Sequence, residues 1–484
     1  YLSVCVFVSM MVSCTTKPAP VPNPAGGVRE QRKWDNQYKR IGLEGMVELE
    51  NGKVEEALDR FEAYLAEHPD DLESMYGLAV AWAQKGDLDR AMRYVRQAVD
   101  AGLPCGRFLA GPRPLLKPLR ETPEFQALAE ELNIELVHGP MLGCVTDATA
   151  TFWVRTAHEV PIQVVVRSED GAEMMSDEVR TRRDLDYTTV ASVDGLKPDT
   201  HYTYRVRVNN SLHPEEYQFR TFPQPGSKTT FQVGFGGGAG YTPDHERMWS
   251  TIRLHDLPGF LFLGDNVYID HPKHPLVQKY CYYRRQSRPE FRSFVPRTSI
   301  FAIWDDHDFV NNDGRGGPKI DEPAWKIPVW WVFKNNWNNP SYGGGETQPG
   351  CWFTFSLGDV DFFMLDGRYY RENPEKNNAS MLGPVQKQWF LNALAESKAK
   401  FKVLASPVPW AYNTKPGSLD TWDGYAEERE EIFTFIEDSK INGVIFISAD
   451  RHRSDVWKIE RPDGYDFYEF ESSRLTNIHR HGII

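Results

Sequence analysis

The spacing of apolar residues changes twice along the chain. Between residues 35 and 134 apolar positions recur at helical spacing, whereas over 135–224 they alternate with polar positions, as they do in half-buried strands. From residue 228 onward, short runs that are apolar throughout are followed by acidic loops, which is typical of buried strands in an α/β sheet. The pattern therefore predicts an all-α, an all-β and an α/β unit, over 35–134, 135–224 and 228–484.

An internal repeat organises the all-α unit. Residues 52–58 align with residues 86–92, and each stretch has a glycine at its first position and an alanine at its sixth. The offset of about 34 residues is the period of tetratricopeptide repeats, in which small residues let paired helices pack closely. Only about two repeats are visible, and about three are needed for a self-standing array. We therefore expect these helices to pack on a neighbouring domain or on a protein partner.

Alternating strands fill the all-β unit. They are expected over residues 149–155, 162–167 and 202–208, with a turn at 195–200 before the Tyr-rich third strand. This arrangement resembles a fibronectin type III-like sandwich of about 90 residues. A domain of this kind is expected to position its neighbours rather than to carry chemistry.

The N-terminal segment has the character of an export signal. Residues 2–12 are apolar and uncharged, too short to span a bilayer and typical of the core of a signal peptide. Residues 11–14 resemble a bacterial lipobox ending at Cys14, and a Pro-rich linker follows over 15–34. We expect 1–14 to be a lipoprotein-type signal, preceded by further residues because the chain begins at Tyr1. The protein would then be a periplasmic or cell-surface lipoprotein that touches the membrane only through its lipid; the alternative is a chance apolar N-terminus.

Net charge excludes one class of partner. The 484 residues carry a charge of −13, which disfavours a protein that binds nucleic acid through a basic surface. The six cysteines include no pair at the Cys-x-x-Cys spacing of zinc or redox sites. If the substrate is an anion, something other than net charge must attract it.

Four predicted buried strands end in acidic residues. The strands are expected over 260–263, 299–304, 360–365 and 443–448, and the acids that follow them are Asp265, Asp306, Asp366 and Asp450. Loops at the carboxyl ends of strands in an α/β sheet converge on one crevice, so these acids should meet. Because several carboxylates in one crevice repel one another, the constellation predicts bound cations.

The available donor atoms predict which cations the site binds. Oxygens of Asp, Asn and Tyr, with His307 and His452 beside them, suit hard ions such as Mn, Ca, Mg or ferric iron. A pair of such ions would clamp a phosphate ester and activate a water for attack. Taken singly, each motif has a plainer interpretation as a turn, a helix start or a surface histidine. Glycine triplets at 236–238 and 343–345 lack the lysine of a phosphate-binding P-loop and are expected to be flexible loops.

Ordered motifs in the last two thirds of the chain resemble a known family. They lie at residues 264–268, 304–312, 365–371, 381–389, 422–425 and 449–452. Together they resemble the alkaline phosphatase D family of metallophosphoesterases over 135–484, with the helical repeat as an addition. The resemblance implies an α/β fold of two facing mixed sheets flanked by helices, and hydrolysis of phosphate mono- or diesters by metal-bound water.

The resemblance also implies roles for individual residues. The residues implied as metal ligands are Asp265, Tyr268, Asp306, Asp450 and His452. Those implied in catalysis are His307, Asp308 and Arg368. His307 would donate a proton to the leaving alcohol, Asp308 or a neighbour would orient its ring, and Arg368 would pair with phosphate oxygens.

The chain departs from the family pattern at the first metal site. The family has a cysteine ligand before the first motif, but residues 232–239 contain neither Cys nor Asp, and no histidine ends the strand at 402–406. Two hypotheses follow. The first is an exported phosphoesterase that uses two or more Ca, Mn or Fe ions, with a cell-wall polymer or a phospholipid as one possible substrate. The alternative is a catalytically weakened cell-envelope scaffold or binding lipoprotein that uses the helical repeats.

Overall fold

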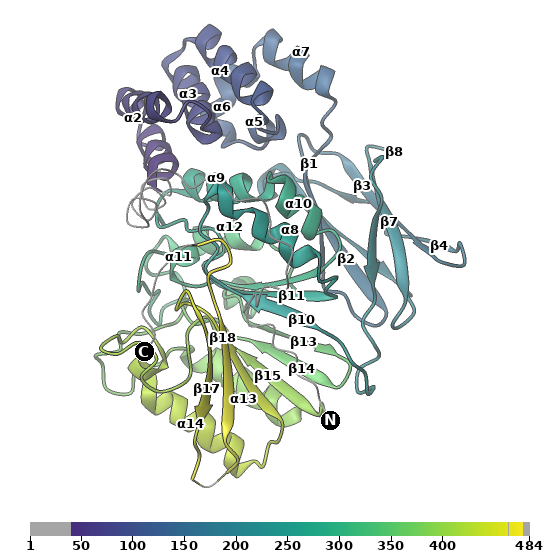
Figure 1. Cartoon of the computed structure of the whole chain (residues 1–484), viewed down its shortest axis with the longest axis vertical. Coiled ribbons are helices and arrows are strands. Elements are labelled where there is room, and N and C mark those ends of the chain that lie inside the picture. The colour runs from purple at the N-terminus through teal and green to yellow at the C-terminus, as the bar shows by residue number, and fades with distance from the viewer. Residues whose placement is uncertain (1–39, 463, 478–484) are drawn as a thin grey trace, which may run out of the picture.

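A computed structural model of the chain describes residues 40–462 and 464–477. The predicted signal segment 1–14, the linker 15–34 and the first residues of the helical unit lie outside the described residues. Within the described ranges, no helix combines the length and the apolar character needed to cross a bilayer. Figure 1 shows three parts: a helical segment, a β unit beside it, and a larger body of sheets and helices that ends at the C-terminus.

The helical segment contains the predicted repeat. After a helix over 40–50, its helices are α2 Val54–Glu67, α3 Leu72–Lys85, α4 Leu88–Asp100, α5 Gly106–Ala110, α6 Arg113–Arg120 and α7 Pro123–Leu132. Gly86 ends α3 with a left-handed φ of 86°, which a residue with a Cβ adopts rarely. Asp71 and Asp87 cap α3 and α4 by accepting hydrogen bonds from backbone N–H groups. Turn chemistry and helical period therefore agree, and the repeat prediction is confirmed.

The first large sheet joins the β unit to the α/β unit over 228–484, the catalytic unit that the family resemblance implies. Its strand order is β10-β11-β12-β1-β2-β6. The strands are β10 Val233–Gly236, β11 Gly259–Leu263, β12 Ser299–Ile303, β1 Leu136–Gly143, β2 Thr149–Thr156 and β6 Thr188–Asp194. β1 pairs in parallel with β12, while β2 and β6 continue the sheet in antiparallel fashion. The predicted self-contained fibronectin type III-like domain is therefore not confirmed, because three of its nine strands, β1, β2 and β6, extend a sheet of the catalytic unit.

A third six-stranded sheet holds the other strands of the β unit. Its strands are β3 Pro161–Ser168, β4 Glu173–Met175, β5 Val179–Arg180, β7 His201–Val208, β8 Ser211–Leu212 and β9 Tyr217–Arg220. Tyr204 of this sheet packs against Phe152 of β2 with ring centroids 4.5 Å apart. The Tyr-rich strand therefore fills a core between the two layers, as β-strand aromatics commonly do.

The second large sheet belongs to the catalytic unit alone. Its order is β13-β14-β15-β16-β18-β17. The strands are β13 Phe353–Leu357, β14 Val360–Met364, β15 Phe401–Ala405, β16 Val444–Ser448, β18 Phe467–Ser472 and β17 Ser454–Ile459. Phe355 stacks on Phe301 of the first sheet at 3.8 Å, and a bridge between Gly237 and Ser473 joins the two sheets at one end. The two sheets therefore face each other across a shared aromatic core.

Helices cover the outer faces of this sandwich (Figure 1). The helices are α8 Arg247–Arg253, α9 Pro275–Gln286, α10 Pro289–Phe294, α11 Asp306–Phe309, α12 Lys326–Lys334, α13 Gly383–Glu396 and α14 Ala426–Asp438, with 3-10 turns η1 Arg183–Leu185, η2 Pro243–His245, η3 Gly345–Thr347 and η4 Trp422–Tyr425. Helices α8 and α10 pack aromatic rings on Phe262 of the first sheet, and α13 and α14 form a separate apolar cluster with the second. The predicted two-sheet α/β sandwich flanked by helices is the architecture observed.

The four acid-bearing strands are all present and buried. They are β11, β12, β14 and β16, and each is followed directly by the acidic loop that the sequence predicts. β11 and β12 are parallel neighbours in the first sheet, whereas β14 and β16 belong to the second. Loops from two sheets, not one, therefore converge on the candidate site.

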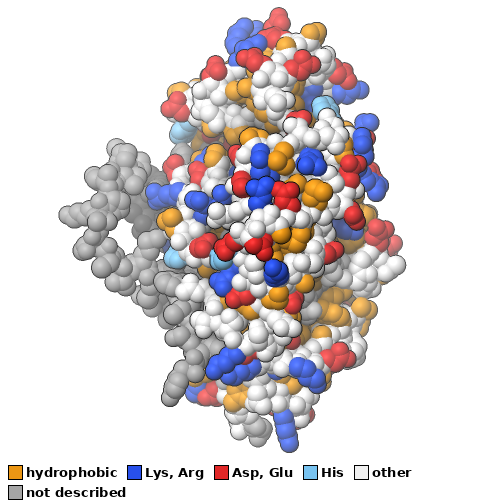
Figure 2. All heavy atoms as spheres, turned by 90° about the vertical axis from the view of Figure 1, so that its right-hand side faces the viewer, with side chains coloured by type: hydrophobic (Ala, Val, Ile, Leu, Met, Phe, Trp, Pro, Cys, Tyr) orange, Lys and Arg blue, Asp and Glu red, His pale blue; other side chains and the backbone are white. Residues whose placement is uncertain are grey.

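Charged side chains of both signs share the visible surface. Figure 2 shows acidic and basic side chains interspersed over the face that it presents, with no large area of one sign.

Cys105, Cys144, Cys281 and Cys351 are free thiols, so none forms a disulfide with another.

Candidate metal centre

The loop after β11 lies directly against the loop after β12. Gly264 has a φ of 106°, and a Cβ there would lie 2.4 Å from the Cβ of Asp305. Only glycine permits this approach. It sets Asp265 beside residues 305–308, which follow β12.

Strained backbone marks the same region. Asp265, Tyr268, Asp270, Asp450 and His452 all have φ between 52° and 70°. Left-handed backbone is uncommon for residues other than glycine and clusters at functional sites, where the surrounding fold holds it in place. Four of these five residues are predicted metal ligands, so the strain coincides with the candidate chemistry.

A hydrogen-bonded group surrounds the Tyr268 hydroxyl. This hydroxyl donates to Asp265 Oδ2 at 2.8 Å and accepts from Asn477 Nδ2 at 2.8 Å. Nε2 of His452 lies 3.5 Å from the same oxygen. Three predicted ligands from two separate sheets therefore meet at one oxygen.

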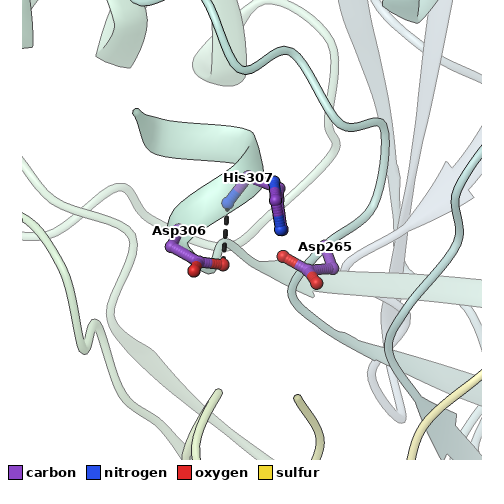
Figure 3. A group of neighbouring side chains, drawn as sticks. All are labelled: Asp265, Asp306 and His307. Atoms are coloured by element: carbon purple, nitrogen blue, oxygen red, sulfur yellow. Dashed lines mark hydrogen bonds between the residues drawn. The ribbon is translucent and has the colours of Figure 1, made fainter. Parts of the chain in front are cut away.

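A second group centres on Asp265, Asp306 and His307. One ligand atom from each lies within 4.8 Å of the others, close enough to share an ion. Figure 3 shows the imidazole of His307 and the carboxylate of Asp265 directed toward each other, from α11 and from the loop after β11. The backbone N–H of His307 also donates to Asp306 Oδ1 at 2.9 Å, which fixes that carboxylate.

Asp308 does not orient the His307 ring. Its carboxylate accepts hydrogen bonds from the backbone N–H groups of Asn266, Val267 and Asp305, so it fastens the first acidic loop to the second. His307 Nδ1 is instead hydrogen-bonded to Asp270 Oδ1 at 2.5 Å. The neighbour that is hydrogen-bonded to the ring is therefore Asp270, while a catalytic role of Asp308 stays a prediction.

The electrostatics of the site favour a cation. Burial raises the pKa of Asp265 well above its usual value; His307 opposes this, and Asp306 adds to it. Burial alone would lower the pKa of His307, but the charges of Asp265, Asp306 and Asp270 raise it well above the usual value. Burial also raises the pKa of Asp450 to about 6. Buried carboxylates that cannot all ionise without positive charge are the expected surroundings of a metal ion.

Arg368 lies beside the site, with a terminal nitrogen 3.9 Å from Asp306 Oδ2. Its side chain is fully buried, with Nε 2.5 Å from Asp305 Oδ1 and the two terminal nitrogens bidentate on Asp420 at 2.7 and 3.1 Å. All three nitrogens are therefore engaged by protein oxygens. The guanidinium ties three loops together, and its pairing with phosphate stays a prediction.

Asp366 is also withdrawn from the crevice. It accepts hydrogen bonds from Trp304 Nε1 at 2.8 Å and from the backbone N–H groups of Cys351 and Arg368. Only three of the four strand-end acids, Asp265, Asp306 and Asp450, are thus available to the site.

A lysine faces the remaining acids. Lys415 Nζ lies 3.5 Å from Asp313, 3.9 Å from Asp420 and 3.8 Å from Asp450. Asp306, Asp313 and Asp420 form a second group whose ligand atoms lie within 4.8 Å of one another. The ammonium of Lys415 therefore neutralises part of the acidic charge on the Asp450 side.

The donor set fits a hard cation. Asp265 Oδ1 and Asp450 Oδ2 are buried oxygens without a hydrogen-bond partner among the described residues. Such groups are costly unless something pairs with them. Carboxylate oxygens, a phenol oxygen and imidazoles are ligands for Ca, Mn or Fe ions, and the residues present fit such ions.

The glycines that follow β10 pack closely against the site. A Cβ on Gly237 would lie 2.8 Å from the carbonyl oxygen of Gly264, and one on Gly238 would lie 3.0 Å from His452 Nδ1. The triplet 236–238, expected to be a flexible loop, is therefore packed tightly into the site. No side chain fits at these two positions without displacing a predicted ligand or its loop.

Sequence reasoning missed several residues of this centre. Asp270 lies in the first acidic loop and Asp420 just before the motif at 422–425, so both are close to motifs that the sequence analysis identified. Lys415 and Asn477 had no such signal, because neither lies in a motif that the sequence analysis identified. Tertiary contacts alone place them here.

Comparison with known proteins agrees with this geometry. The family model described as PhoD-like phosphatase matches residues 233–480, just over half of the chain. The chain belongs to the PhoD-like phosphatase family. A tetratricopeptide repeat model matches residues 43–102, and a domain of unknown function matches 133–234.

Individual relatives of the PhoD-like family cover only part of the protein. Alkaline phosphatase D of Bacillus subtilis (strain 168) is 25% identical over 321 residues, which are 56% of this chain and 54% of that protein. The chain thus spans about half the length of this curated relative. A solved structure of PhoD is 20% identical in sequence and has a TM-score of 0.59. The match covers 69% of this chain and 76% of the PhoD chain. That likeness supports the fold.

Proposed function

We propose that this protein is a metal-dependent phosphoesterase that hydrolyses phosphate mono- or diesters. Membership of the PhoD-like family supports a phosphate ester as substrate. The observation that carries metal dependence is the group of Asp265, Asp306 and His307, whose ligand atoms lie within 4.8 Å of one another and in which the buried Asp265 Oδ1 has no hydrogen-bond partner among the described residues. The negative charge of buried carboxylates is best balanced by bound cations.

The proposed ligands come from the three loops after β11, β12 and β16. Asp265, Tyr268, Asp306, Asp450 and His452 would hold two or more Ca, Mn or Fe ions. When bound, such ions supply a nucleophilic water at neutral pH and positive charge for the phosphate oxygens. Asp308, Asp305 and the glycines at 237 and 238 keep these loops in place. Arg368 acts through Asp305 and Asp420 as a positioning residue.

His307 is the proposed proton donor. Its Nδ1 is held by Asp270, which leaves Nε2 on the side of Asp265. Asp270 fixes the tautomer and the ring plane, and a proton on Nε2 can pass to the oxygen of the leaving alcohol. Stacking of the ring on Tyr268, with centroids 4.3 Å apart, restricts its rotation further.

Metal removal should abolish turnover. Purified protein treated with a chelator should lose hydrolysis of 4-nitrophenyl phosphate and bis(4-nitrophenyl) phosphate, and regain it with Mn, Ca or Fe. Activity is measured as release of nitrophenol, and the two esters separate mono- from diesterase activity. Absence of metal-stimulated turnover of both esters would favour the scaffold alternative.

Replacing Asp270 with asparagine should lower kcat about 10- to 100-fold, the usual effect of losing a residue that orients a catalytic ring. If His307 protonates the leaving group, the loss should be larger for alkyl phosphates, whose alcohols leave poorly, than for nitrophenyl phosphate. Asp256→Asn is a matched control, since Asp256 is exposed and has a similar left-handed φ of 47°. An equal loss for both classes of ester would contradict proton donation by His307.

Export and anchoring are proposed on the sequence alone. The apolar stretch 2–12 and the lipobox-like segment ending at Cys14 support an exported lipoprotein of the periplasm or cell surface, attached to the membrane only by its lipid. Acylation of Cys14 in the full precursor, measured by mass spectrometry, tests this.

A further inference from the structure

The helical repeat docks on one helix of the catalytic unit, α9. Gly42, in the helix over 40–50, lies so close to α9 that a Cβ there would be 2.5 Å from the Tyr280 hydroxyl. Rings of Tyr76 in α3 and Tyr280 in α9 stack at 6.0 Å. Figure 1 shows the same relation, with the purple repeat helices on the outer side of α9. The surface that could have received a separate partner helix is thus occupied by a helix of the same chain.

A buried charge cluster fixes the middle of this contact. Arg107 of α5 donates to Glu73 of α3 at 3.0 Å, and the Tyr280 hydroxyl donates to the same Glu73 oxygen at 2.8 Å. The Arg107 and Glu73 side chains are 1% and 6% exposed. Because a buried pair is stable only in a well-defined geometry, the cluster gives the docking a single register.

Glu50 of the repeat caps the N-terminus of α9. The helix has no cap from its own preceding residue, His274. The two carboxylate oxygens of Glu50 instead lie 3.5 and 3.3 Å from the backbone nitrogens of Leu276 and Val277, and one lies 3.6 Å from His274 Nδ1. A negative group at this point satisfies free N–H groups and the helix dipole.

Helix α9 in turn holds the loop that carries the candidate ligands. Arg285 donates to the carbonyl oxygens of Asn266 and Ala239, at 3.1 and 2.6 Å. Cys281 Sγ lies 3.8 Å from the carbonyl oxygen of Tyr268, and Gln278 donates to that of His271 at 3.0 Å. The left-handed residues of the loop are therefore braced from α9.

We propose that the helical repeat is a built-in positioning element of the catalytic centre, and that Glu50 is its positioning residue for the loop 264–274. The inference rests on the proposed function. By capping and clamping α9, the repeat fixes Tyr268 and also Asp270, the residue that orients His307. This explains why about two repeats suffice: the catalytic unit completes their packing.

The test compares Glu50→Ala with Glu50→Gln in the full chain. Loss of the cap should speed amide hydrogen exchange over residues 264–280 about fivefold in Glu50→Ala. The looser loop should lower kcat about tenfold with KM unchanged, since small displacements of catalytic groups are costly. Glu50→Gln retains a carbonyl oxygen that can accept from the same N–H groups, so it should recover part of both effects.

The controls separate the possible failures. Glu56→Ala, at an exposed position in the repeat, should match wild type in exchange and kcat. Wild-type exchange over 264–280 in Glu50→Ala overturns the proposal, and so does an equal increase of exchange throughout the catalytic unit, which would indicate general loosening. If wild-type protein has no turnover, the proposed function fails while the exchange measurement still decides whether the repeat braces the loop.

Discussion

Replacing Asp265 with asparagine should lower phosphoesterase activity about 10³-fold, because the substitution removes several kcal/mol of charge at the metal centre. It should do so without unfolding the protein. Burial and the acids nearby already disfavour the ionised form of Asp265, so the neutral amide relieves repulsion in the metal-free protein. The amide oxygen can still accept from the Tyr268 hydroxyl. Activity and stability should therefore change in opposite directions, as is common at strained functional sites.

Three measurements check this expectation. Nitrophenyl ester hydrolysis gives the activity, elemental analysis gives the bound metal, and urea unfolding of the metal-free protein gives its stability. Asp438→Asn, at an exposed position of α14, is the control and should leave all three unchanged. Near-normal activity in Asp265→Asn would remove this residue from the proposed ligands, and a large loss of stability would assign it a structural role instead.

Replacing Arg368 with methionine should destabilise the fold by about 3–5 kcal/mol, the cost of leaving buried carboxylates without their partner. Although burial opposes ionisation, Arg368 and Arg371 hold the pKa of Asp420 well below its usual value, so this acid is charged in the folded protein. Asp305 loses its partner in the same substitution. Because Asp305 caps α11, which carries Asp306 and His307, activity should fall as well.

The measurement is the free energy of unfolding in urea. Arg96→Met is the matched control, since its pair with Glu124 is about half exposed and should contribute less than about 1 kcal/mol. Arg368→Lys should fall between wild type and methionine, because lysine retains the charge but lacks the planar fork that binds Asp420. If Arg368→Met kept wild-type stability and lost only substrate affinity, the result would support the phosphate contact that the family resemblance implies.

Local signals were sufficient for the elements of the catalytic unit. Buried strands such as β11 and β12 are apolar at every position, and glycine and aspartate end them abruptly, so both strand and acidic loop can be predicted without tertiary information. The repeat was equally accessible, because its period and its turn glycines are local properties. These predictions needed only interactions between residues close in sequence.

The boundary of the β unit could not be predicted in the same way. Strand β2 begins with the alternating burial of a strand in a free sandwich, and β1 is buried at every position. Neither pattern shows which strand lies beside it. The parallel pairing of β1 with β12 joins residues more than a hundred positions apart. Sheet order depends on such distant pairings, which local pattern does not encode.

The sequence by itself determined the α/β class, the repeat, and the acids at the strand ends, since hydrophobic period and residue chemistry specify which groups are available; the two facing sheets were implied by the family resemblance. Only the tertiary structure decided which of them meet. Asp366 and Arg368 form buried hydrogen bonds with other side chains, and Asp270 is hydrogen-bonded to the His307 ring. Lys415 and Asn477 lie at the centre although no motif contains them. The physical reason is that a side chain's role depends on the partners within a few ångströms of it, and those partners come from segments far apart in the chain.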